Sequence, residues 1–403
     1  MRRLALAGAV LILVAVGVVV AHRVLRPQAP TIVGSTTTEY APSAPVTTPP
    51  PEPGIAWATY GYDEQRTRAL VRLRLQPPFR RLWTWHGQAL LEFPPVVGYG
   101  RVYIATIDGR MYSLDEATGR AVWRYDSGRC GWASPALASH LVFETFIGNP
   151  ECGSRVRDGQ VLAFDALTGH VRWHRRVGPT ESSPLVAHGA VYIGDWNGRV
   201  WSLDAASGRV LWTRDLHGPI KGSLALAGGR LAIGTYGGDV VSLDARTGRV
   251  LWTSGGHGRL YSSPAVAYGR IYIGSLDGGV YAFGAASGRL LWSRPTGSYV
   301  YASPAVWRHS VLVGSYDHRF YALDAGTGEL RWRFDADGPI SGSATVIDGL
   351  VYFSTFHQHT YVLRARDGAS VTEWPDGWYS PAVAGAKRLY LVGRGRLYAL
   401  APR

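Results

Sequence analysis

Short apolar runs separated by glycine-containing breaks make up most of the chain. Between residues 262 and 292 the runs SPAVA, RIYIGS, VYAF and RLLW are interrupted at Tyr268-Gly269, Asp277-Gly278 and Ser287-Gly288. Runs of this length bounded by turn residues are typical of β-strands, and Asp-Gly supplies the positive-φ residue that two-residue hairpins favour. No stretch after residue 54 shows a sustained helical period. The pattern predicts four short strands, joined as a meander, in each such unit.

The four-strand unit repeats along the chain, and a tryptophan ends each copy. The closing tryptophans are separated by 40, 50, 39, 40, 40 and 40 residues. They are Trp83, Trp123, Trp173, Trp212, Trp252, Trp292 and Trp332. A fixed period of this length indicates a solenoid, a propeller or an array, and four strands per unit repeated in a ring are typical of a β-propeller blade.

The number of blades follows from the residue pairs, mostly Ser-Pro, that precede each first strand. They begin near Pro94, Ser134, Ser183, Ser223, Ser263, Ser303, Ser343 and Ser380, which gives eight units. The last unit, from Ser380 to Pro402, lacks a closing strand, whereas FRRLWTW (79–85) is a closing strand with no unit before it. We therefore predict an all-β, eight-bladed propeller of four-stranded blades, in which the N-terminal strand completes the C-terminal blade and leaves no open sheet edge.

The turn before each closing tryptophan follows the pattern A-x-T-G-x-x-x-W, seen in residues 117–123, 166–173 and 325–332. This element resembles the tryptophan-docking motif of pyrroloquinoline-quinone-like (PQQ-like) propeller repeats, and the resemblance covers about residues 56–403. It implies that each tryptophan docks between adjacent blades, where a large flat apolar side chain suits the packing. The motif weakens in the seventh unit, where residues 364–368 replace it and Trp374 lies two residues late.

The N-terminal residues predict a membrane anchor followed by a linker. Residues 4–21 form an uncharged apolar run of 18 residues, about 27 Å as a helix, which is the short end of a membrane span. A cleaved signal peptide is the alternative, with Val19 and Ala21 as a weak cleavage pattern. We expect residues 1–3 in the cytoplasm, 4–21 as a transmembrane signal anchor, 22–54 as a linker rich in Pro, Thr and Ser, and 55–403 as the propeller outside the cytoplasm. In polyproline geometry residues 27–54 of this linker would reach about 85 Å and hold the propeller away from the membrane.

The only cysteines, Cys130 and Cys152, both lie in the one interval that is lengthened to 50 residues. In an exported chain a disulfide is the expected state, and it would fix the inserted loop to the start of the second blade. Chain-entropy reasoning gives such a bridge about 3 kcal/mol. Free thiols are the alternative. Metal binding by the two cysteines is not expected, because their spacing leaves no other ligands for a metal.

The net charge of +13 comes almost entirely from arginine, with Lys221 and Lys387 as the only lysines. A basic surface suits nucleic acid, anionic lipid or an anionic wall polymer. Arginine recurs in the turn after glycine, however, so the charge is spread around the ring. Together with a place outside the cytoplasm, this argues against nucleic acid.

One position varies among otherwise matching units and is therefore free of a scaffold role. It lies two residues before each of the pairs, mostly Ser-Pro, that precede a first strand. The first strand is the innermost strand of a blade, so these side chains should ring one mouth of the central channel. These residues are Glu92, Trp132, Glu181, Lys221, Tyr261, Tyr301, Ser341 and Trp378. Four aromatic side chains with two glutamates and a lysine predict a ligand- or partner-binding rim. The alternative is that they only fill the channel and order its water.

Catalysis has less support. The resemblance to quinone-dependent dehydrogenases implies an adjacent Cys-Cys pair, a calcium ion held by Glu, Asn and Asp, and a catalytic Asp, whereas this sequence has no Cys-Cys pair. His357 and His359 share one face of a strand, but no third metal ligand is visible. We therefore predict no catalytic residue, no cofactor and no metal.

These observations predict a membrane-anchored, extracytoplasmic propeller that serves as a non-catalytic protein-binding or scaffolding module at the cell envelope. The chain resembles in outline the propeller lipoprotein of the outer-membrane β-barrel assembly machine, which implies binding of protein by the rim and loops. It departs from that protein because it has no lipobox cysteine near the N-terminus. A PQQ-dependent dehydrogenase-like enzyme and an envelope sensor or wall-polymer-binding module are the alternatives.

Overall fold

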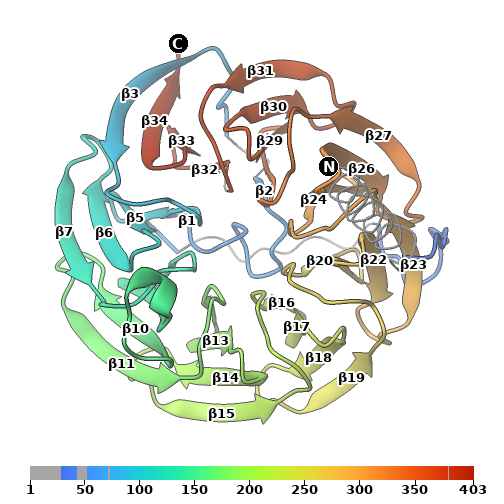
Figure 1. The fold of residues 1–403 in the computed structure, drawn as a ribbon, viewed down its shortest axis with the longest axis horizontal. Helices are drawn as coiled ribbons and strands as arrows, with labels where there is room; N and C mark the ends of the chain where they lie inside the picture. The colour runs from blue at the N-terminus through green and yellow to red at the C-terminus, as the bar shows by residue number, and fades with distance from the viewer. Residues whose placement is uncertain (1–28, 43–51, 71–72, 380) are drawn as a thin grey trace, which may run out of the picture.

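A computed structural model describes residues 29–42, 52–70, 73–379 and 381–403. These residues form eight β-sheets arranged as blades around a central axis (Figure 1). The prediction of an all-β, eight-bladed propeller with four-stranded blades is confirmed. Ser380, which the sequence places at the start of the last blade, lies outside the described residues.

The first four blades are built from consecutive strands. Blade one holds β4 (Val96–Gly98), β5 (Arg101–Ala105), β6 (Arg110–Asp115) and β7 (Ala121–Asp126), with β1 (Ile55–Trp57) added inside β4. Blade two holds β8 (Ala136–Ala138), β9 (Leu141–Ile147), β10 (Gly159–Asp165) and β11 (Val171–Val177). Blade three holds β12 (Leu185–Ala187), β13 (Ala190–Gly194), β14 (Arg199–Asp204) and β15 (Val210–Asp215). Blade four holds β16 (Ala225–Ala227), β17 (Arg230–Gly234), β18 (Val240–Asp244) and β19 (Val250–Ser254).

The last four blades complete the ring. Blade five holds β20 (Ala265–Ala267), β21 (Arg270–Gly274), β22 (Gly279–Gly284) and β23 (Leu290–Pro295). Blade six holds β24 (Ala305–Trp307), β25 (Ser310–Gly314), β26 (Arg319–Asp324) and β27 (Leu330–Asp335). Blade seven holds β28 (Thr345–Ile347), β29 (Leu350–Ser354), β30 (Thr360–Arg364) and β31 (Ser370–Trp374), with β2 (Ala69–Leu70) beside β28. Blade eight holds β32 (Ala382–Ala384), β33 (Leu389–Val392), β34 (Arg396–Pro402) and β3 (Phe79–His86).

In blades one to seven the four main strands run antiparallel from the channel outward in chain order, whereas in blade eight the outermost strand β3 comes first in the chain. In blade five, Ala265 pairs with Tyr272, and Ala282 pairs with Trp292. The second strand of this blade, β21, is buried at every residue because neighbouring blades cover both of its faces. An outermost strand such as β27 alternates between exposed and half-buried residues. The apolar core therefore lies between blades.

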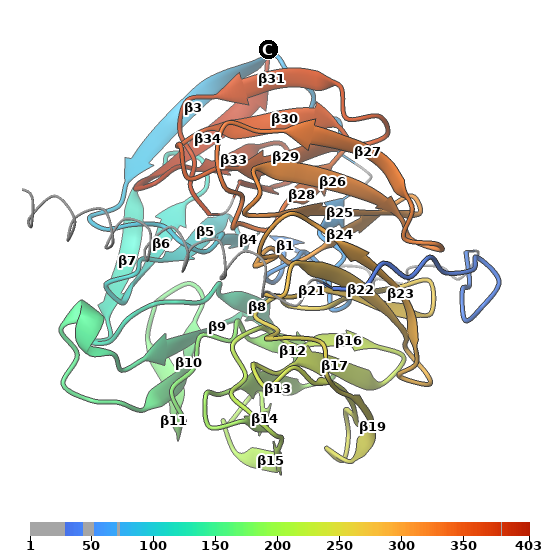
Figure 2. The ribbon, with the colours of Figure 1, turned by 45° about the vertical axis from the view of Figure 1, so that its right-hand side comes forward.

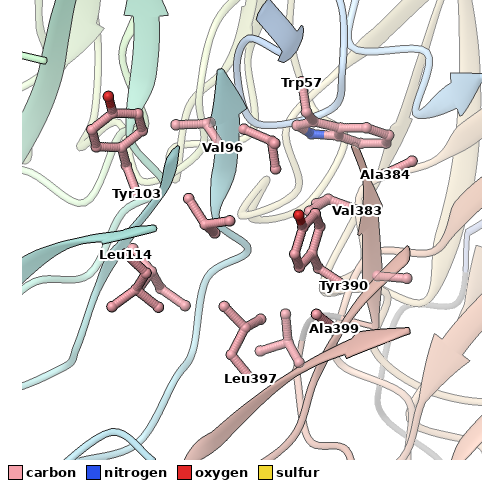
Figure 3. Packing of buried hydrophobic residues seen from close by; sticks show 14 of the residues in the cluster. Trp57, Val96, Tyr103, Leu114, Val383, Ala384, Tyr390, Leu397 and Ala399 are labelled. Carbon is pink, nitrogen blue, oxygen red and sulfur yellow. The ribbon is translucent and has the colours of Figure 1, made fainter. Parts of the chain in front are cut away.

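The ring closes at blade eight, where the N-terminal strand β3 pairs antiparallel with β34, Thr84 opposite Tyr398. This pairing confirms the predicted seam. Figure 3 shows the packing beside it: Leu397 and Val383 of blade eight lie on one side of a cluster whose other side holds Val96 of blade one.

Each of the seven closing tryptophans contacts the following blade. The indole N–H of Trp123 donates to the carbonyl of Ala166 at 3.0 Å, and the ring lies against Gly169. The same two contacts recur at every closing tryptophan, and they include Trp332 against Ala365 and Gly368 in the divergent seventh unit. A β-carbon at these glycines would lie within 2.7 Å of the ring, and each has a positive φ. Glycine is therefore required at this turn by space as well as by conformation.

One mouth of the channel is filled by residues 54–70, an arrangement that the sequence did not predict (Figure 1). We call residues 54–70 the plug. In five blades the backbone N–H of the middle residue of the innermost strand donates to a carbonyl of the plug. The donor and acceptor pairs are Leu137 to Ala58, Leu226 to Glu64, Val266 to Gln65, Val306 to Thr67 and Val346 to Arg68. Arg66 is fully buried, and its guanidinium donates to the carbonyls of Tyr60, Ser183 and Leu224.

Residues 29–42 form a strap that packs against blades five and six, where the sequence predicted part of a free linker. Figure 2 shows this segment in blue beside β22 and β23. Ile32 pairs with Ser293 of β23, and the buried guanidinium of Arg270 donates to the carbonyls of Ser35 and Thr38. The prediction of a tether is wrong for these residues because main-chain hydrogen bonds, which composition does not reveal, fix them to the propeller.

The predicted anchor at residues 4–21 lies outside the described part of the chain. Among the described residues there is no helix with the length and apolarity of a membrane span. Cys130 and Cys152 are joined in a disulfide, with Cα atoms 5.7 Å apart, as predicted. Cys152 ends the short 3₁₀ helix η1 (Pro150–Cys152) in the inserted loop of blade two.

Candidate functional site

A cavity of about 230 Å³ lies at the channel mouth opposite the end where the plug enters. Its floor is Tyr60 of the plug, whose hydroxyl is 3.0 Å from the Ser343 hydroxyl. Six of the eight predicted rim residues line it: Glu92, Glu181, Lys221, Tyr261, Tyr301 and Ser341. The structure thus brings six of the eight residues together around one cavity, whose floor the comparison of repeats did not reveal.

The two remaining predicted residues, Trp132 and Trp378, do not belong to the lining of this cavity. Trp132 is half-buried at the start of blade two. The Trp378 ring packs against Phe356, with centroids 5.1 Å apart, and the Arg394 guanidinium lies 5.0 Å from its centre. Trp378 thus packs against side chains of the turns around the mouth.

The rim residues are held at one level by a chain of hydrogen bonds between blades. The backbone N–H of each starting serine donates to the hydroxyl of the equivalent serine in the next blade. The pairs are Ser134 to Ser183, Ser183 to Ser223, Ser223 to Ser263, Ser263 to Ser303 and Ser303 to Ser343, at 2.8–3.0 Å. Serine at this position therefore has a structural role, and the residue two positions earlier is left to face the mouth.

Glu181 is the most buried charged group of the rim, with 6% of its surface exposed. Its carboxylate accepts hydrogen bonds from the Tyr261 hydroxyl at 2.7 Å and from the Trp196 indole at 3.0 Å. The Lys221 ammonium lies 3.3 Å from the same carboxylate. Burial raises the pKa of Glu181, and Lys221 acts in the opposite direction. The pair is a buried, hydrogen-bonded ion pair in one wall of the cavity.

Glu92 supplies the second carboxyl group of the cavity. Burial, and secondarily the negative charge of Glu181, raise the pKa of Glu92 to about 7. The side chain therefore changes charge close to neutral pH. Tyr261, Tyr316 and Tyr379 line the same cavity, and the negative charge of Glu92 adds to the burial that raises the pKa of each tyrosine. The cavity holds one neutralised carboxylate and one titrating carboxyl group.

Sequence reasoning missed several aromatic residues of the site. Tyr316 and Tyr379 line the cavity beside the predicted Tyr301, and the rings of Tyr301 and Tyr316 lie 4.9 Å apart. Tyr316 follows the second strand of its blade, where its N–H donates to the Tyr299 carbonyl of the connection that leads to the rim. The equivalent residues are Ile107, Trp196, Tyr236, Leu276, Phe356 and Arg394. This second variable position could have been found by the same comparison of repeats.

The histidine pair named in the sequence lies apart from the cavity. His359 Nδ1 is 2.5 Å from an Asp337 carboxylate oxygen, and His357 Nδ1 is 3.9 Å from the same oxygen. Within the described ranges, no three His, Cys, Asp or Glu side chains converge as metal ligands would.

The residues of the cavity do not fit pyrroloquinoline quinone. That cofactor is a polycarboxylate, and the charged groups that line the cavity are Glu92, Glu181 and Lys221, which together carry no excess of positive charge. The two cysteines are 22 positions apart and bonded in the loop of blade two, so they do not form the adjacent pair of the dehydrogenases.

Curated relatives of two kinds match parts of the chain. One is an outer membrane protein assembly factor BamB of Nitrosomonas eutropha, 28% identical over 148 residues, which are 36% of this chain and 33% of that protein. Another is the dehydrogenase subunit of a quinone alcohol dehydrogenase of Gluconobacter oxydans, 30% identical over 195 residues, which are 39% of this chain and 24% of that protein. The chain thus spans about a quarter to a third of the length of these relatives.

Solved structures share the fold at low sequence identity. BamB from Moraxella catarrhalis superposes with a TM-score of 0.65 at 16% identity, over 80% of this chain and 99% of that chain. A quinohemoprotein alcohol dehydrogenase from Comamonas testosteroni gives a TM-score of 0.71 at 14% identity, over 86% of this chain and 80% of that chain. Both likenesses concern the propeller fold alone.

The family comparison covers far more of the chain. A family model described as "Outer membrane protein assembly factor BamB" matches residues 71–212, 196–305 and 277–403, and these segments together span all eight blades. The chain belongs to this family of PQQ-like β-propellers.

Proposed function

We propose that this protein is a non-catalytic protein-binding scaffold of the cell envelope and that it binds its partner at the face that carries the cavity. Residues 4–21 anchor it in the membrane, and the propeller lies on the extracytoplasmic side. The observation that carries the proposal is the asymmetry of the ring. One channel mouth is filled by the plug, whereas the side chains that differ from blade to blade converge on the other.

The chemistry of the open mouth supports recognition. Tyr261, Tyr301 and Tyr316 form a row of edge-to-face and tilted ring pairs, with centroids 5.2 and 4.9 Å apart. Tyrosines of this kind are enriched among the residues that dominate binding energy at interfaces. Relatives described as outer membrane assembly factors agree with a scaffolding role.

Crosslinking on the anchored protein in its own membranes tests this proposal. A photoreactive residue placed at position 301 should form adducts, and Tyr261→Ala should suppress them. The matched control carries the photoreactive residue at the exposed Arg120, on the turn that joins the third and fourth strands of blade one, at the other face. Adducts at position 120 together with none at position 301 would contradict the proposed binding face.

A quinone-dependent dehydrogenase is the second candidate because alcohol dehydrogenases of this class align with 39% of the chain. Reconstitution with pyrroloquinoline quinone and calcium, followed by an alcohol-oxidation assay with an artificial electron acceptor, decides between the two. The scaffold proposal predicts no turnover above the cofactor alone. Turnover that depends on the protein and on calcium would contradict the scaffold proposal and support the dehydrogenase.

A further inference from the structure

The charges that line the cavity leave it with an excess of negative charge once Glu92 ionises. The charged lining residues are Glu92, Glu181 and Lys221. Lys221 is already committed to Glu181, from which it is separated by 3.3 Å. When Glu92 is ionised as well, these three lining charges sum to −1, and opposite charges attract more strongly in such a poorly hydrated place.

The walls offer the groups that recognise an organic cation. Tyr261, Tyr301, Tyr316 and Tyr379 present ring faces and edges around the carboxyl groups. An ammonium group gains further energy from an aromatic face within about 6 Å. The same wall already shows this contact, because the Lys221 ammonium lies 3.9 Å from the centre of the Trp196 ring. Acidic and aromatic groups together favour a cation over an anion or a neutral sugar.

The size of the cavity limits the ligand. A volume of about 230 Å³ is smaller than the roughly 300–1,000 Å³ of pockets that enclose drug-sized molecules. Tyr60 closes the floor, so a ligand enters only from the open mouth. Half-buried Tyr301 stands at that mouth. A single alkyl chain with a charged end fits these dimensions.

We propose that the channel cavity binds one primary alkylammonium group, with the charged nitrogen held by Glu92 and Glu181 and the alkyl chain against the tyrosine rings. The group is a lysine side chain of the bound partner or a free amine of the same size. The first source rests on the proposed scaffold function, whereas the second does not.

Binding depends on pH because a proton and the ammonium compete for Glu92. Glu181, Tyr261, Tyr316 and Tyr379 share the cavity with this carboxyl group, and Lys221 lies 3.3 Å from the Glu181 carboxylate. Glu92 loses its proton near pH 7, where an alkylamine is still fully charged. Affinity should therefore rise between pH 6 and pH 8 and stay level above that range.

Calorimetric titration of the folded protein with butylammonium tests the site, and 1-butanol and glucose serve as uncharged probes. We expect butylammonium to bind about tenfold more tightly at pH 8 than at pH 6, as expected when a single carboxylate ionises. Glu92→Gln should abolish this pH dependence, and the exposed Glu373→Gln should retain it. Equal affinity for 1-butanol, tighter binding of glucose, or no binding of butylammonium at pH 8 would overturn the proposal.

A second titration separates the sources of the ammonium group. A short peptide with one central lysine is compared with the same peptide carrying acetyl-lysine. Binding that requires the free ammonium supports a partner side chain, whereas binding of butylammonium without the peptide supports a free amine. If no crosslinks form at position 301 while butylammonium still binds, the scaffold function is refuted and the ammonium site is retained.

Discussion

Glu92→Gln should stabilise the protein at neutral and alkaline pH. The folded protein raises the pKa of Glu92 from 4.5 to about 7, because the carboxyl group is buried and faces Glu181. At about 1.36 kcal/mol per pKa unit, the ionised group costs the fold about 3 kcal/mol relative to the unfolded chain. Glutamine has nearly the same shape and no charge, so the substitution removes this cost.

The sign follows from linkage. Because the folded pKa lies above the unfolded value, the folded state binds more protons between pH 4.5 and about 7, and stability falls as pH rises through this window. Below pH 4.5 the carboxyl group is neutral in both states, and the cost is absent. The difference in unfolding free energy between Glu92→Gln and the unaltered protein should therefore grow from near zero at pH 4 to about 3 kcal/mol at pH 8.

Urea unfolding followed by tryptophan fluorescence, at pH 4, 5, 6, 7 and 8, measures this difference. Glu373→Gln, at an exposed site on β31, is the matched control and should show no such trend. Glu181→Gln should reduce the effect at Glu92, because it removes the second cause of the shift. Parallel stability curves for Glu92→Gln and the unaltered protein would refute the reasoning that this carboxyl group is buried and charged at neutral pH.

Three further predictions concern the ring. Trp292→Ala should lower the free energy of unfolding by about 3 to 5 kcal/mol, because this tryptophan is fully buried beneath the strap. Trp252→Ala should lower it less, because the Trp252 ring is partly exposed. Calorimetry measures both losses, and equal losses would contradict the role of the strap. Deleting residues 1–51 should lower the melting temperature but leave a monomer, whereas deleting residues 1–86 should cause aggregation visible by gel filtration, since it removes β3 and exposes the edge of β34. Replacing both cysteines by serine should cost about 3 kcal/mol and make the loop of blade two sensitive to protease; an unchanged midpoint in urea would argue against that value.

The blades and the seam could be predicted because side chains record them. Each closing tryptophan contacts a glycine of the next blade, so the pair recurs at the period of the repeat. The same period showed that residues 79–85 were a closing strand without a blade. In the structure this strand pairs with β34 of blade eight, the blade that lacked a closing strand. The rim was found by the opposite signal, namely variation at a position where the scaffold makes no demand.

The plug and the strap could not be predicted because main-chain atoms hold them. Carbonyls of residues 58–68 accept the hydrogen bonds of the innermost strands, and almost any residue supplies a carbonyl. The side chains gave misleading signals. Arginine usually lies at the surface, yet Arg66 and Arg270 are both buried, because surrounding carbonyls accept hydrogen bonds from their guanidinium groups.

The pairing of β3 with β34 also sets an order in time. As the chain is made, the four main strands of each blade from the first to the seventh are consecutive in sequence and can pair in turn. β3 has no partner until β34 has been made, because the seam joins Thr84 to Tyr398 across the length of the propeller. Closing so long a loop is slow, since its entropy must be lost before any seam contact forms. An unfinished chain therefore carries an open sheet edge at β3, and the ring closes only after synthesis has passed the eighth blade.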